Sequence, residues 1–433
     1  MNRTKSSDIT SDLLYRSAAW VPDMTGVEAA PIPPGGTKPW ARWVEAELGF
    51  RNHWYPVFPA RDLAPGAGKA VVLMGEEILF VRNKAGKLYA LEDRCAHRGA
   101  RLSCRPLLYT DDTITCWHHA FTYNLDDGTI ACILNDPTSS MAGQAGIKIY
   151  PVEEAKGLVF CFVGDIDPPP LAHDVPPGFL DPDMAVRVAE PYVVHANWRL
   201  GCEGGYDPSH HFIHNWSPFN INLQIPAAFG FAPEPAQVVE TTTYVADDGG
   251  PRGFTRDQQA THPRFRATIP ANRNRGPVEV VLPLAYDKDE AEIRAMGEVN
   301  YTTKVGLWLP CGLKVDPWPY PGLFHNEYYV PRDATSHYYI QCGWRRVSSE
   351  AEREDWETGE LGRVRWEVPV VEDFTSADAF AREGTTKFYD EEGGWELERL
   401  NQPDIELLMW RIFASDQARG IQKPDHTKGR FKR

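Results

Sequence analysis

The sequence lacks the marks of a membrane or secreted protein. It contains no apolar run of about 18 residues or more, so we expect no membrane-spanning helix. The opening stretch MNRTKSSDITSDLLYRSAAW has no apolar core of the kind that a signal peptide needs. Eight cysteines spread over 433 residues are too sparse for the disulfide framework of a secreted chain. These absences together favour a cytoplasmic protein.

Basic residues are also in deficit. The chain has 45 Lys and Arg against 60 Asp and Glu, which gives a formal net charge of −15. Proteins that bind nucleic acid through its phosphates need clustered basic residues, so this class of function is excluded. The sequence has no internal repeat or low-complexity tract. Its length predicts a folded protein with more than one domain.

The pattern along the chain predicts three parts. Residues 1–45 contain a stretch rich in Pro and Gly and form an N-terminal arm. Residues 46–170 hold short runs such as AVVLM, ILFV and LVFCFV between turn signals, which predicts a small antiparallel β domain. The stretch DIDPPPLAHDVPPGF carries five prolines and marks the boundary. Residues 171–433 mix strand-like runs with the helical stretch PDIELLMWRIFASDQ, so we expect an α+β domain.

Two short motifs each pair a cysteine with a histidine. RCAHRGA contains Cys95 and His97, and TCWHHAFTY contains Cys116 and His119. In a Rieske [2Fe–2S] centre two histidines replace two cysteines on one of the irons. The spacing therefore indicates such a cluster, in which Cys95 and Cys116 hold one iron and His97 and His119 hold the other. Neutral imidazoles raise the potential to roughly −150 to +300 mV.

Zinc is the alternative ion for this site. Structural zinc sites commonly bring their sulfurs in C-x₂₋₄-C pairs and their histidines in H-x₃₋₅-H pairs. Here each pair mixes sulfur and nitrogen, and the β-rich surroundings offer no finger helix, so the cluster is favoured. His118 has the wrong spacing from Cys116 and is expected to point outward or to pack. Cys104 is expected to be a small buried or loop residue.

A second group of histidines lies in GCEGGYDPSHHFIHNW. A helix that begins at Pro208 places His210 and His214 on one face, with Asp207 beside them. Two such histidines and a carboxylate from elsewhere form the facial triad that leaves positions on Fe(II) open for O₂. The alternative is that Asp207 is only an N-cap and that the histidines are core or surface residues. His211 is expected to line the pocket or to pack.

The spacing of residues alone does not identify the third iron ligand or the residues of the pocket wall. The acidic candidates downstream are Glu372, Asp373, Asp378, Glu383, Asp390 and Asp404. The nearest apolar candidates for the wall, each of which is otherwise a core residue, are Phe212, Ile213, Trp216, Phe219, Ile221 and Leu223.

The order of the two groups, the cluster motif followed by D-x-x-H-x-x-x-H, resembles the terminal oxygenase subunits of Rieske non-haem iron oxygenases. Within them the chain is similar to the branch of carbazole dioxygenase and oxoquinoline monooxygenase. The likeness runs from ELGFRNHWYPV near residue 47 to RGIQ at 419–422. It passes through RCAHRGA, TITCWHHAFTY, YDPSH, WLPCGLKVDPWPYP and YVPRD, and it ends in DAFARE, FYDEEGGW and RGIQ.

The resemblance implies roles for individual residues. Asp378, which opens DAFARE, is implied as the third iron ligand beside His210 and His214. Asp207 matches an aspartate that bridges an iron ligand to a cluster histidine of the neighbouring subunit. The implied bridge runs from His119 of one subunit through Asp207 to His210 of the next, and a carboxylate is the usual acceptor for the free N–H of a metal-bound imidazole.

One departure stands beside these motifs. Many family members have Asn after the glutamate in this region, where the chain has Gly204 after Glu203. A nearby amide is therefore missing. Beside the first motif, Arg98, Arg101 and Arg105 are candidates for docking an acidic ferredoxin, or else they are only solvated.

The resemblance also implies the fold and the activity. We expect a small antiparallel β Rieske domain followed by a larger α+β catalytic domain with a central antiparallel sheet of the helix-grip type. One Rieske cluster and one mononuclear Fe(II) per chain are implied, with electrons from a ferredoxin and an NAD(P)H-dependent ferredoxin reductase. The chain is then a homotrimeric terminal oxygenase that hydroxylates an aromatic or N-heteroaromatic ring. The alternatives are a Rieske monooxygenase or oxidative demethylase, and a Rieske electron carrier without oxygenase activity.

Overall fold

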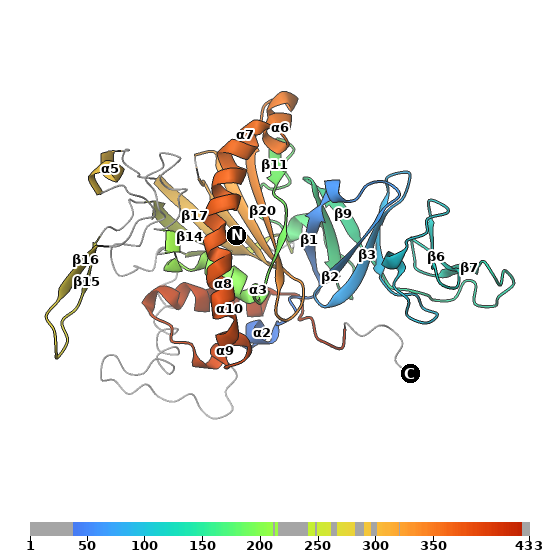
Figure 1. The fold of residues 1–433 in the computed structure, drawn as a ribbon, viewed down its shortest axis with the longest axis horizontal. Helices are drawn as coiled ribbons and strands as arrows, with labels where there is room; N and C mark the ends of the chain where they lie inside the picture. The colour runs from blue at the N-terminus through green and yellow to red at the C-terminus, as the bar shows by residue number, and fades with distance from the viewer. Residues whose placement is uncertain are drawn as a thin grey trace.

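The computed structural model describes residues 38–210, 213–214, 241–246, 249–260, 266–281, 290–295, 301–319 and 321–426. Figure 1 shows a β-rich part that is built from the first half of the chain, beside a larger part in which one long helix crosses a sheet. No helix in these ranges has both the length and the apolar character that a membrane span requires.

The β-rich part contains three antiparallel sheets. The first has the order β1-β10-β9, the second β2-β3-β4-β8, and the third β5-β6-β7. β10 is buried along its whole length, as its apolar run LVFCFV predicts. The strands are β1 (His53–Pro59), β2 (Gly68–Leu73), β3 (Glu76–Arg82), β4 (Leu88–Glu92), β5 (Thr113–Thr115), β6 (Phe121–Asn124), β7 (Ile130–Ile133), β8 (Ile149–Tyr150), β9 (Val152–Ala155) and β10 (Leu158–Val163).

The larger part is organised around an eight-stranded antiparallel sheet. Its order is β11-β20-β19-β18-β17-β14-β13, and β12 also pairs with β20. A separate hairpin of β15 and β16 projects from this part (Figure 1). The strands are β11 (Met184–Val188), β12 (Tyr192–Val194), β13 (Thr241–Val245), β14 (Arg252–Ala260), β15 (Arg266–Ile269), β16 (Val278–Val281), β17 (Tyr301–Trp308), β18 (Gly312–Asp316), β19 (Leu323–Pro331) and β20 (His337–Arg346).

Helices cover one face of this sheet. α8 runs across it, and α3 lies between α8 and the strands (Figure 1). β19 is consequently buried at nearly every position, including three consecutive polar residues, His325, Asn326 and Glu327. The helices are α2 (Ala41–Glu45), α3 (Trp198–Tyr206), α5 (Glu290–Ala295), α6 (Glu350–Glu357), α7 (Glu360–Gly362), the π-helical η5 (Arg363–Phe374), α8 (Thr375–Asp390), α9 (Gly394–Leu397) and α10 (Ile405–Gln417), with short 3₁₀ turns at η1 (Ala60–Asp62), η2 (Leu102–Cys104), η3 (Leu171–His173) and η6 (Gln402–Asp404).

The fold class expected from the sequence is confirmed. The antiparallel β part precedes an α+β part with a central antiparallel sheet, and the helical stretch near the C-terminus is α10. The boundary at residue 170 stays a proposal. One hydrophobic core runs from β1 and β10 into the larger sheet without a break, and the cluster loops have a smaller core of their own.

The two ends of the described chain tie these parts together. Trp43 of α2 is buried against Trp198 and Trp410, with ring centroids 5.1 and 5.9 Å away. Near the other end, Arg419 donates to the carboxylate of Asp174 at 2.8 Å, and Asp174 also accepts from His53 at 2.8 Å. A buried ion pair therefore joins β1, the end of η3 and the C-terminal segment.

Burial of His337 gives a testable pH dependence. Its Nδ1–H donates to the carbonyl of Ala196 at 2.7 Å, and burial lowers its pKa to about 3. An unfolded histidine has a pKa of about 6.5, so the unfolded chain binds this proton first as the pH falls. We expect this group to remove about 1.4 kcal/mol of unfolding free energy per pH unit below about pH 6.5, until the folded pKa is reached.

The matched variant is His337→Asn, whose amide still donates to Ala196. Urea unfolding of both proteins between about pH 7 and pH 5 measures the effect. The variant is expected to lose less stability on acidification. An equal acid dependence in the two proteins would contradict the role of His337.

Candidate metal centres and pocket

The first centre is built from two tight loops at the far end of the β-rich part. In the loop after β4, the N–H of Gly99 donates to the carbonyl of Cys95 at 2.9 Å, and Gly99 has the positive φ of 74° that this turn requires. In the loop after β5, the N–H of Ala120 donates to the carbonyl of Cys116 at 3.0 Å. Each loop thus places a cysteine at its base and a histidine near its tip.

The four predicted cluster ligands lie as two pairs. Cys95 and Cys116 are buried, His119 is half-buried and His97 is exposed. The rings of His97 and His119 have centroids 4.7 Å apart, and their planes are 86° to one another. Two buried thiols and two outer imidazoles form the donor set of a Rieske cluster, so these residues fit that group.

Tyr123 of β6 contacts the sulfur of one predicted ligand. Its hydroxyl oxygen accepts the backbone N–H of Ala96 at 3.0 Å, so the hydroxyl hydrogen is directed to Sγ of Cys95 at 3.1 Å. Hydrogen bonds to cluster sulfurs favour the reduced state because they compensate its added negative charge. Tyr123 is therefore expected to raise the potential of the cluster.

Replacing Tyr123 by Phe removes this hydrogen bond and keeps the ring. We expect the cluster potential to fall by tens of mV, since a tenfold change in a one-electron equilibrium is about 59 mV. Potentiometric titration followed by the visible spectrum of the cluster measures the change. An unchanged potential with an intact cluster would show that the hydroxyl has no such effect.

The neighbours of the cluster loops lie largely as expected. His118 is exposed and its ring stacks on Trp117 at 5.3 Å, as expected for a residue that points outward. Cys104 is an exposed residue at the end of η2. Arg98 and Arg105 are exposed, and Arg101 makes an exposed ion pair with Glu77. A role of these arginines in docking stays a proposal.

The second centre begins where α3 ends. The predicted helix start at Pro208 lies too early: α3 ends at Tyr206 and Pro208 lies in a bend. The described residues His210, Ile213 and His214 have 3₁₀-helical conformation. A proline disfavours helical geometry in the residue before it, and Asp207 has φ −55° and ψ 121°. The carboxylate of Asp207 accepts the N–H of Ser209 at 2.6 Å, which stabilises the bend.

Asp207 orients the first histidine through its main chain. Nδ1–H of His210 donates to the carbonyl oxygen of Asp207. The opposite nitrogen, Nε2, is thereby turned toward α8. The sequence reasoning expected the Asp207 carboxylate to hold this ring, whereas the structure gives that contact to the backbone. His211 lies outside the described residues.

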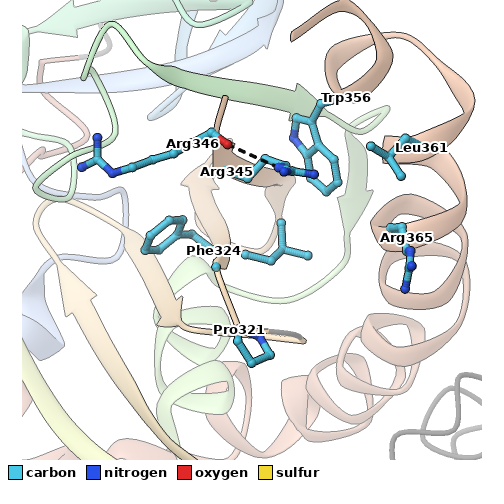
Figure 2. Close-up of a pocket in the computed structure, with 9 residues that line it drawn as sticks. Pro321, Phe324, Arg345, Arg346, Trp356, Leu361 and Arg365 are labelled. Carbon is cyan, nitrogen blue, oxygen red and sulfur yellow. Dashed lines mark hydrogen bonds between the residues drawn. The ribbon is translucent and has the colours of Figure 1, made fainter. Parts of the chain in front are cut away.

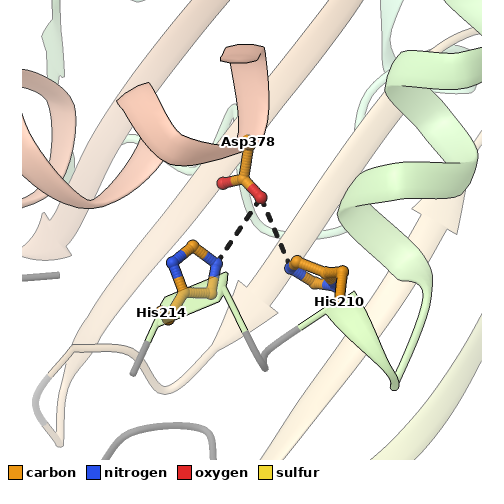
Figure 3. Close-up of side chains that lie close together, drawn as sticks. All are labelled: His210, His214 and Asp378. Atoms are coloured by element: carbon orange, nitrogen blue, oxygen red, sulfur yellow. Dashed lines mark ion pairs between the residues drawn. The ribbon is translucent and has the colours of Figure 1, made fainter. Parts of the chain in front are cut away.

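Three predicted ligands converge at this point. Nε2 of His210 and Nε2 of His214 each lie 3.5 Å from Oδ1 of Asp378 (Figure 3). The ligand atoms of all three residues lie within 4.8 Å of one another. Donors about 2.1 Å from a common ion lie roughly 3 to 3.5 Å apart, so the set fits one metal ion. Two imidazoles and one carboxylate are the donors of the non-haem Fe(II) triad.

The charge states suit a metal site. Burial lowers the pKa of His210 to about 4, so its imidazole is neutral, as a ligand must be. Burial opposes the ionisation of Asp378, but His214, Arg382 and His210 outweigh it and lower the pKa of Asp378 to about 2. His214 is held by stacking on Phe374, with ring centroids 3.6 Å apart.

The acidic candidates separate by burial. Asp378 is buried on the face of α8 that meets α3 and the sheet. The other candidates lie outside the group of three ligands, and they are either exposed or partly exposed: Glu372, Asp373, Glu383, Asp390 and Asp404.

A cavity of about 40 Å³ opens beside the triad. It is lined by Gly205, His210, Val305, Leu313, Val315, Trp318, His325, Glu327, Phe374 and Asp378. Ligand sites for ring-sized molecules are usually several hundred Å³, so the described residues form only the part of the wall next to the triad. Among the sequence candidates for this wall, Ile213 is described and is not a lining residue. Phe212, Trp216, Phe219, Ile221 and Leu223 lie outside the described residues.

The lining residues of β17 and β18 fall within residues 215–330, where the many Phe, Pro, Leu, Ile and Val residues predict the wall of an apolar pocket, but the sequence does not single them out. Val305, Leu313 and Val315 are apolar residues on paired strands. The alternation of apolar residues in VGLWL and GLKV is a signal that one face of these strands is covered. That signal does not say what covers the face.

A wider hollow of about 510 Å³ lies between the start of β19, the end of β20 and the α6–α7 region (Figure 2). Its apolar wall includes Phe324 and Trp356, and three arginines border it. One of them, Arg346, is paired with Asp183 at 2.5 Å. None of the described residues around it is a histidine, cysteine or carboxylate, so we place the chemistry at the smaller cavity.

Comparison with known protein families gives two matches. Residues 53–151 match the Rieske [2Fe–2S] domain, and residues 162–422 match the family described as homotrimeric ring hydroxylase. Both predicted centres thus lie inside matched regions, the first in the Rieske match and the second in the hydroxylase match.

Individual proteins give the same result. The chain is 40% identical over 394 residues to the terminal oxygenase component of carbazole 1,9a-dioxygenase from Metapseudomonas resinovorans, which covers 90% of this chain and 97% of that one. The solved terminal oxygenase of carbazole 1,9a-dioxygenase from Nocardioides aromaticivorans IC177 superimposes with a TM-score of 0.76 at 37% identity, over 89% of this chain and 99% of that one. A reduced complex of the oxygenase and ferredoxin of carbazole 1,9a-dioxygenase gives a TM-score of 0.76 at 35% identity, over 96% and 97%.

These matches cover nearly the whole chain, including the part that carries the predicted iron triad, and so exclude an electron carrier made of a Rieske domain alone. The cofactors of the family are one Rieske [2Fe–2S] cluster and one mononuclear iron. The chain therefore belongs to the Rieske non-haem iron ring-hydroxylating oxygenases and is a terminal oxygenase component of that family.

Proposed function

We propose that this oxygenase hydroxylates a polycyclic or nitrogen-heterocyclic aromatic compound of the carbazole type. The observation that carries the proposal is the convergence of His210, His214 and Asp378 beside an apolar cavity. The likeness over 90% of the chain to oxygenases that are named for carbazole supports the substrate class. Half of the residues that line the cavity are apolar or aromatic, namely Val305, Leu313, Val315, Trp318 and Phe374, which suits contact with a flat hydrocarbon ring.

Each ligand has a proposed task. Cys95 and Cys116 hold one iron of the cluster, and His97 and His119 hold the other. His210, His214 and Asp378 hold the mononuclear iron. When this iron is bound, it supplies the one-electron chemistry that triplet O₂ requires. Trp318, Val315 and Phe374 exclude water and hold the ring beside this site.

Electrons are proposed to reach the triad from a neighbouring subunit. Figure 1 shows β6 and β7, beside the cluster loops, at one end of the molecule, while α3 and α8, which adjoin the triad, lie near its middle. The matched family is described as homotrimeric. In such a trimer we propose that His119 of one subunit lies beside Asp207 of the next. Asp207 is adjacent to the bend that carries His210, so a carboxylate there is suited to connect the two centres.

The partners follow from the same likeness. We propose a ferredoxin as the direct electron donor and an NAD(P)H-dependent ferredoxin reductase behind it, as in the ferredoxin complex of the similar oxygenase. Because NAD(P)H is a cytoplasmic reductant, the reaction is proposed to take place in the cytoplasm. Cell fractionation tests that location.

Monooxygenation is the second candidate reaction. The oxygenase subunit of 5,5'-dehydrodivanillate O-demethylase from Sphingobium is 25% identical over 173 residues, 39% of this chain and 40% of that one. Demethylation and dihydroxylation need the same three ligands, so the ligands do not distinguish them.

Substrate-dependent oxygen uptake tests the proposal. The reconstituted system is supplied with carbazole-like, quinolone-like and simple benzoate compounds, and the products formed under labelled O₂ are analysed. Carbazole-like compounds are expected to stimulate uptake most strongly, with both labelled atoms in one product. One labelled atom per product favours monooxygenation, and uptake with benzoates alone would refute the substrate class.

A further inference from the structure

A buried arginine lies one helical turn after the proposed carboxylate ligand. Asp378 and Arg382 are four residues apart on α8, so both side chains leave the same face of the helix. They are 5% and 3% exposed. A guanidinium this close to a carboxylate normally forms a bidentate ion pair with it, and such a pair would occupy the oxygens that a metal needs.

The structure directs this guanidinium elsewhere. Nη2 of Arg382 lies 3.8 Å from Oε2 of Glu327 on β19. The guanidinium also lies over the aromatic rings of Tyr329 and Tyr339, at 4.9 and 4.7 Å from their centroids. Arg382 and Asp378 are both described residues, and they make no direct ion pair. Oδ1 of Asp378 instead faces the two imidazoles at 3.5 Å.

Glu327 is itself held in one orientation. The indole N–H of Trp366 donates to Nδ1 of His325 at 3.0 Å, so Nε2 carries the hydrogen of this ring. That Nε2–H donates to Oε1 of Glu327 at 2.9 Å, and the hydroxyl of Tyr329 donates to Oε2. Burial opposes the charge on Glu327, but His325 and Arg382 outweigh it and lower its pKa. Glu327 is therefore a fixed, buried carboxylate.

Arg382 also lies beside α3, at the glycine where the sequence departs from many relatives. A Cβ at Gly204 would lie 3.4 Å from Nε and 3.6 Å from Cγ of Arg382, which is ordinary van der Waals contact. The side chain of Arg382 is therefore in reach of both α3 and β19.

We propose that Glu327 is a positioning residue that draws Arg382 away from Asp378 and so keeps the Asp378 carboxylate available to the mononuclear iron. This inference rests on the proposed function, because it takes Asp378 as a ligand. Glu327 also lines the cavity beside the triad, so it lies close to the carboxylate whose availability it is proposed to maintain.

Metal affinity, measured apart from turnover, tests the proposal. The mononuclear site of the purified trimer is emptied by mild chelation and titrated anaerobically with Fe(II), while the visible spectrum monitors the cluster. Glu327→Gln keeps the shape of the side chain but removes its charge. We expect the affinity to fall about 10- to 100-fold, the usual effect of losing a group that supports a ligand.

A second substitution separates positioning from a merely structural role. In Glu327→Gln combined with Arg382→Met, the competing guanidinium is gone, and we expect the affinity to return to within a few-fold of the unmodified protein. If Glu327 only stabilises the fold, the double variant binds as weakly as the single one. That result, or full affinity in Glu327→Gln, would overturn the proposal.

Two further variants guard against misfolding and against failure of the ligand assignment. Arg382→Met alone is expected to bind Fe(II) at least as tightly as the unmodified protein, and loss of binding would also overturn the proposal. Asp174→Asn removes a buried carboxylate from Arg419, remote from the triad, and should leave the affinity unchanged. If Asp378→Ala retains Fe(II), the ligand assignment fails. If it loses Fe(II) while Glu327→Gln does not, only the positioning inference fails.

Discussion

Replacing Asp378 by Ala is expected to remove the mononuclear iron and leave the Rieske cluster in place. Asp378 is proposed to supply the only carboxylate of the triad, and two imidazoles without it lack both the third donor and the negative charge. Iron quantitation is expected to fall from about three to about two per chain, with an unchanged visible spectrum of the cluster. Oxygenation of any substrate should fall to background.

The helix itself should tolerate this change, because alanine is a better helix former than aspartate. Asp390→Ala is the matched control. This substitution removes an aspartate carboxylate from the exposed end of α8 and should leave iron content and activity unchanged. If Asp378→Ala retains about three irons per chain or turns over normally, another residue holds the iron.

Replacing Asp207 by Asn is expected to keep both metals and to lower multiple-turnover activity by about 100-fold. The amide oxygen still accepts from Ser209, and the backbone carbonyl still accepts from His210, so the bend and the ligand are preserved. What changes is the negative charge that is proposed to connect the neighbouring subunit's His119 with His210. Electron transfer between the two centres is measured separately by reducing the cluster, adding substrate and O₂, and following the rate at which the cluster is reoxidised.

Two measurements make this assignment specific. Iron content in Asp207→Asn should equal that of the unmodified protein, since no proposed ligand is lost. Single turnover of a trimer that is reduced at both centres beforehand should also be slowed, because each cycle needs two electrons and the mononuclear iron supplies only one of them, so the other must cross the interface from the cluster. Undiminished repeated turnover would exclude the bridging role.

The cluster ligands are readable from sequence because each pair lies within one tight loop. Cys95 and His97 are two residues apart, and Cys116 and His119 are three apart, so the local backbone alone brings each pair together. Apolar patterning likewise predicted the β strands and α10, because burial of one face repeats with the period of the element. The assignment of these residues as ligands remains a prediction.

The local rule for proline was correct about a helical turn but not about where it starts. Pro208 restricts Asp207 and so ends α3, and the 3₁₀-helical residues begin only at His210. The Asp207 side chain stabilises the bend between them, and its carbonyl orients His210.

The sequence alone predicted which residue types make up both centres. These are a cysteine and a histidine in each of two loops, and two histidines that need a carboxylate from another part of the chain. The resemblance singled out Asp378 among six acids, and only the assembled fold shows it buried beside the two histidines. The fold also placed β17 and β18 along the cavity and set Arg382 against Glu327 instead of its helical neighbour. Spacing along the chain governs only contacts made within one loop or one helix turn. Contacts between α3, α8 and β19 depend on how those elements pack, and no short stretch of residues encodes that.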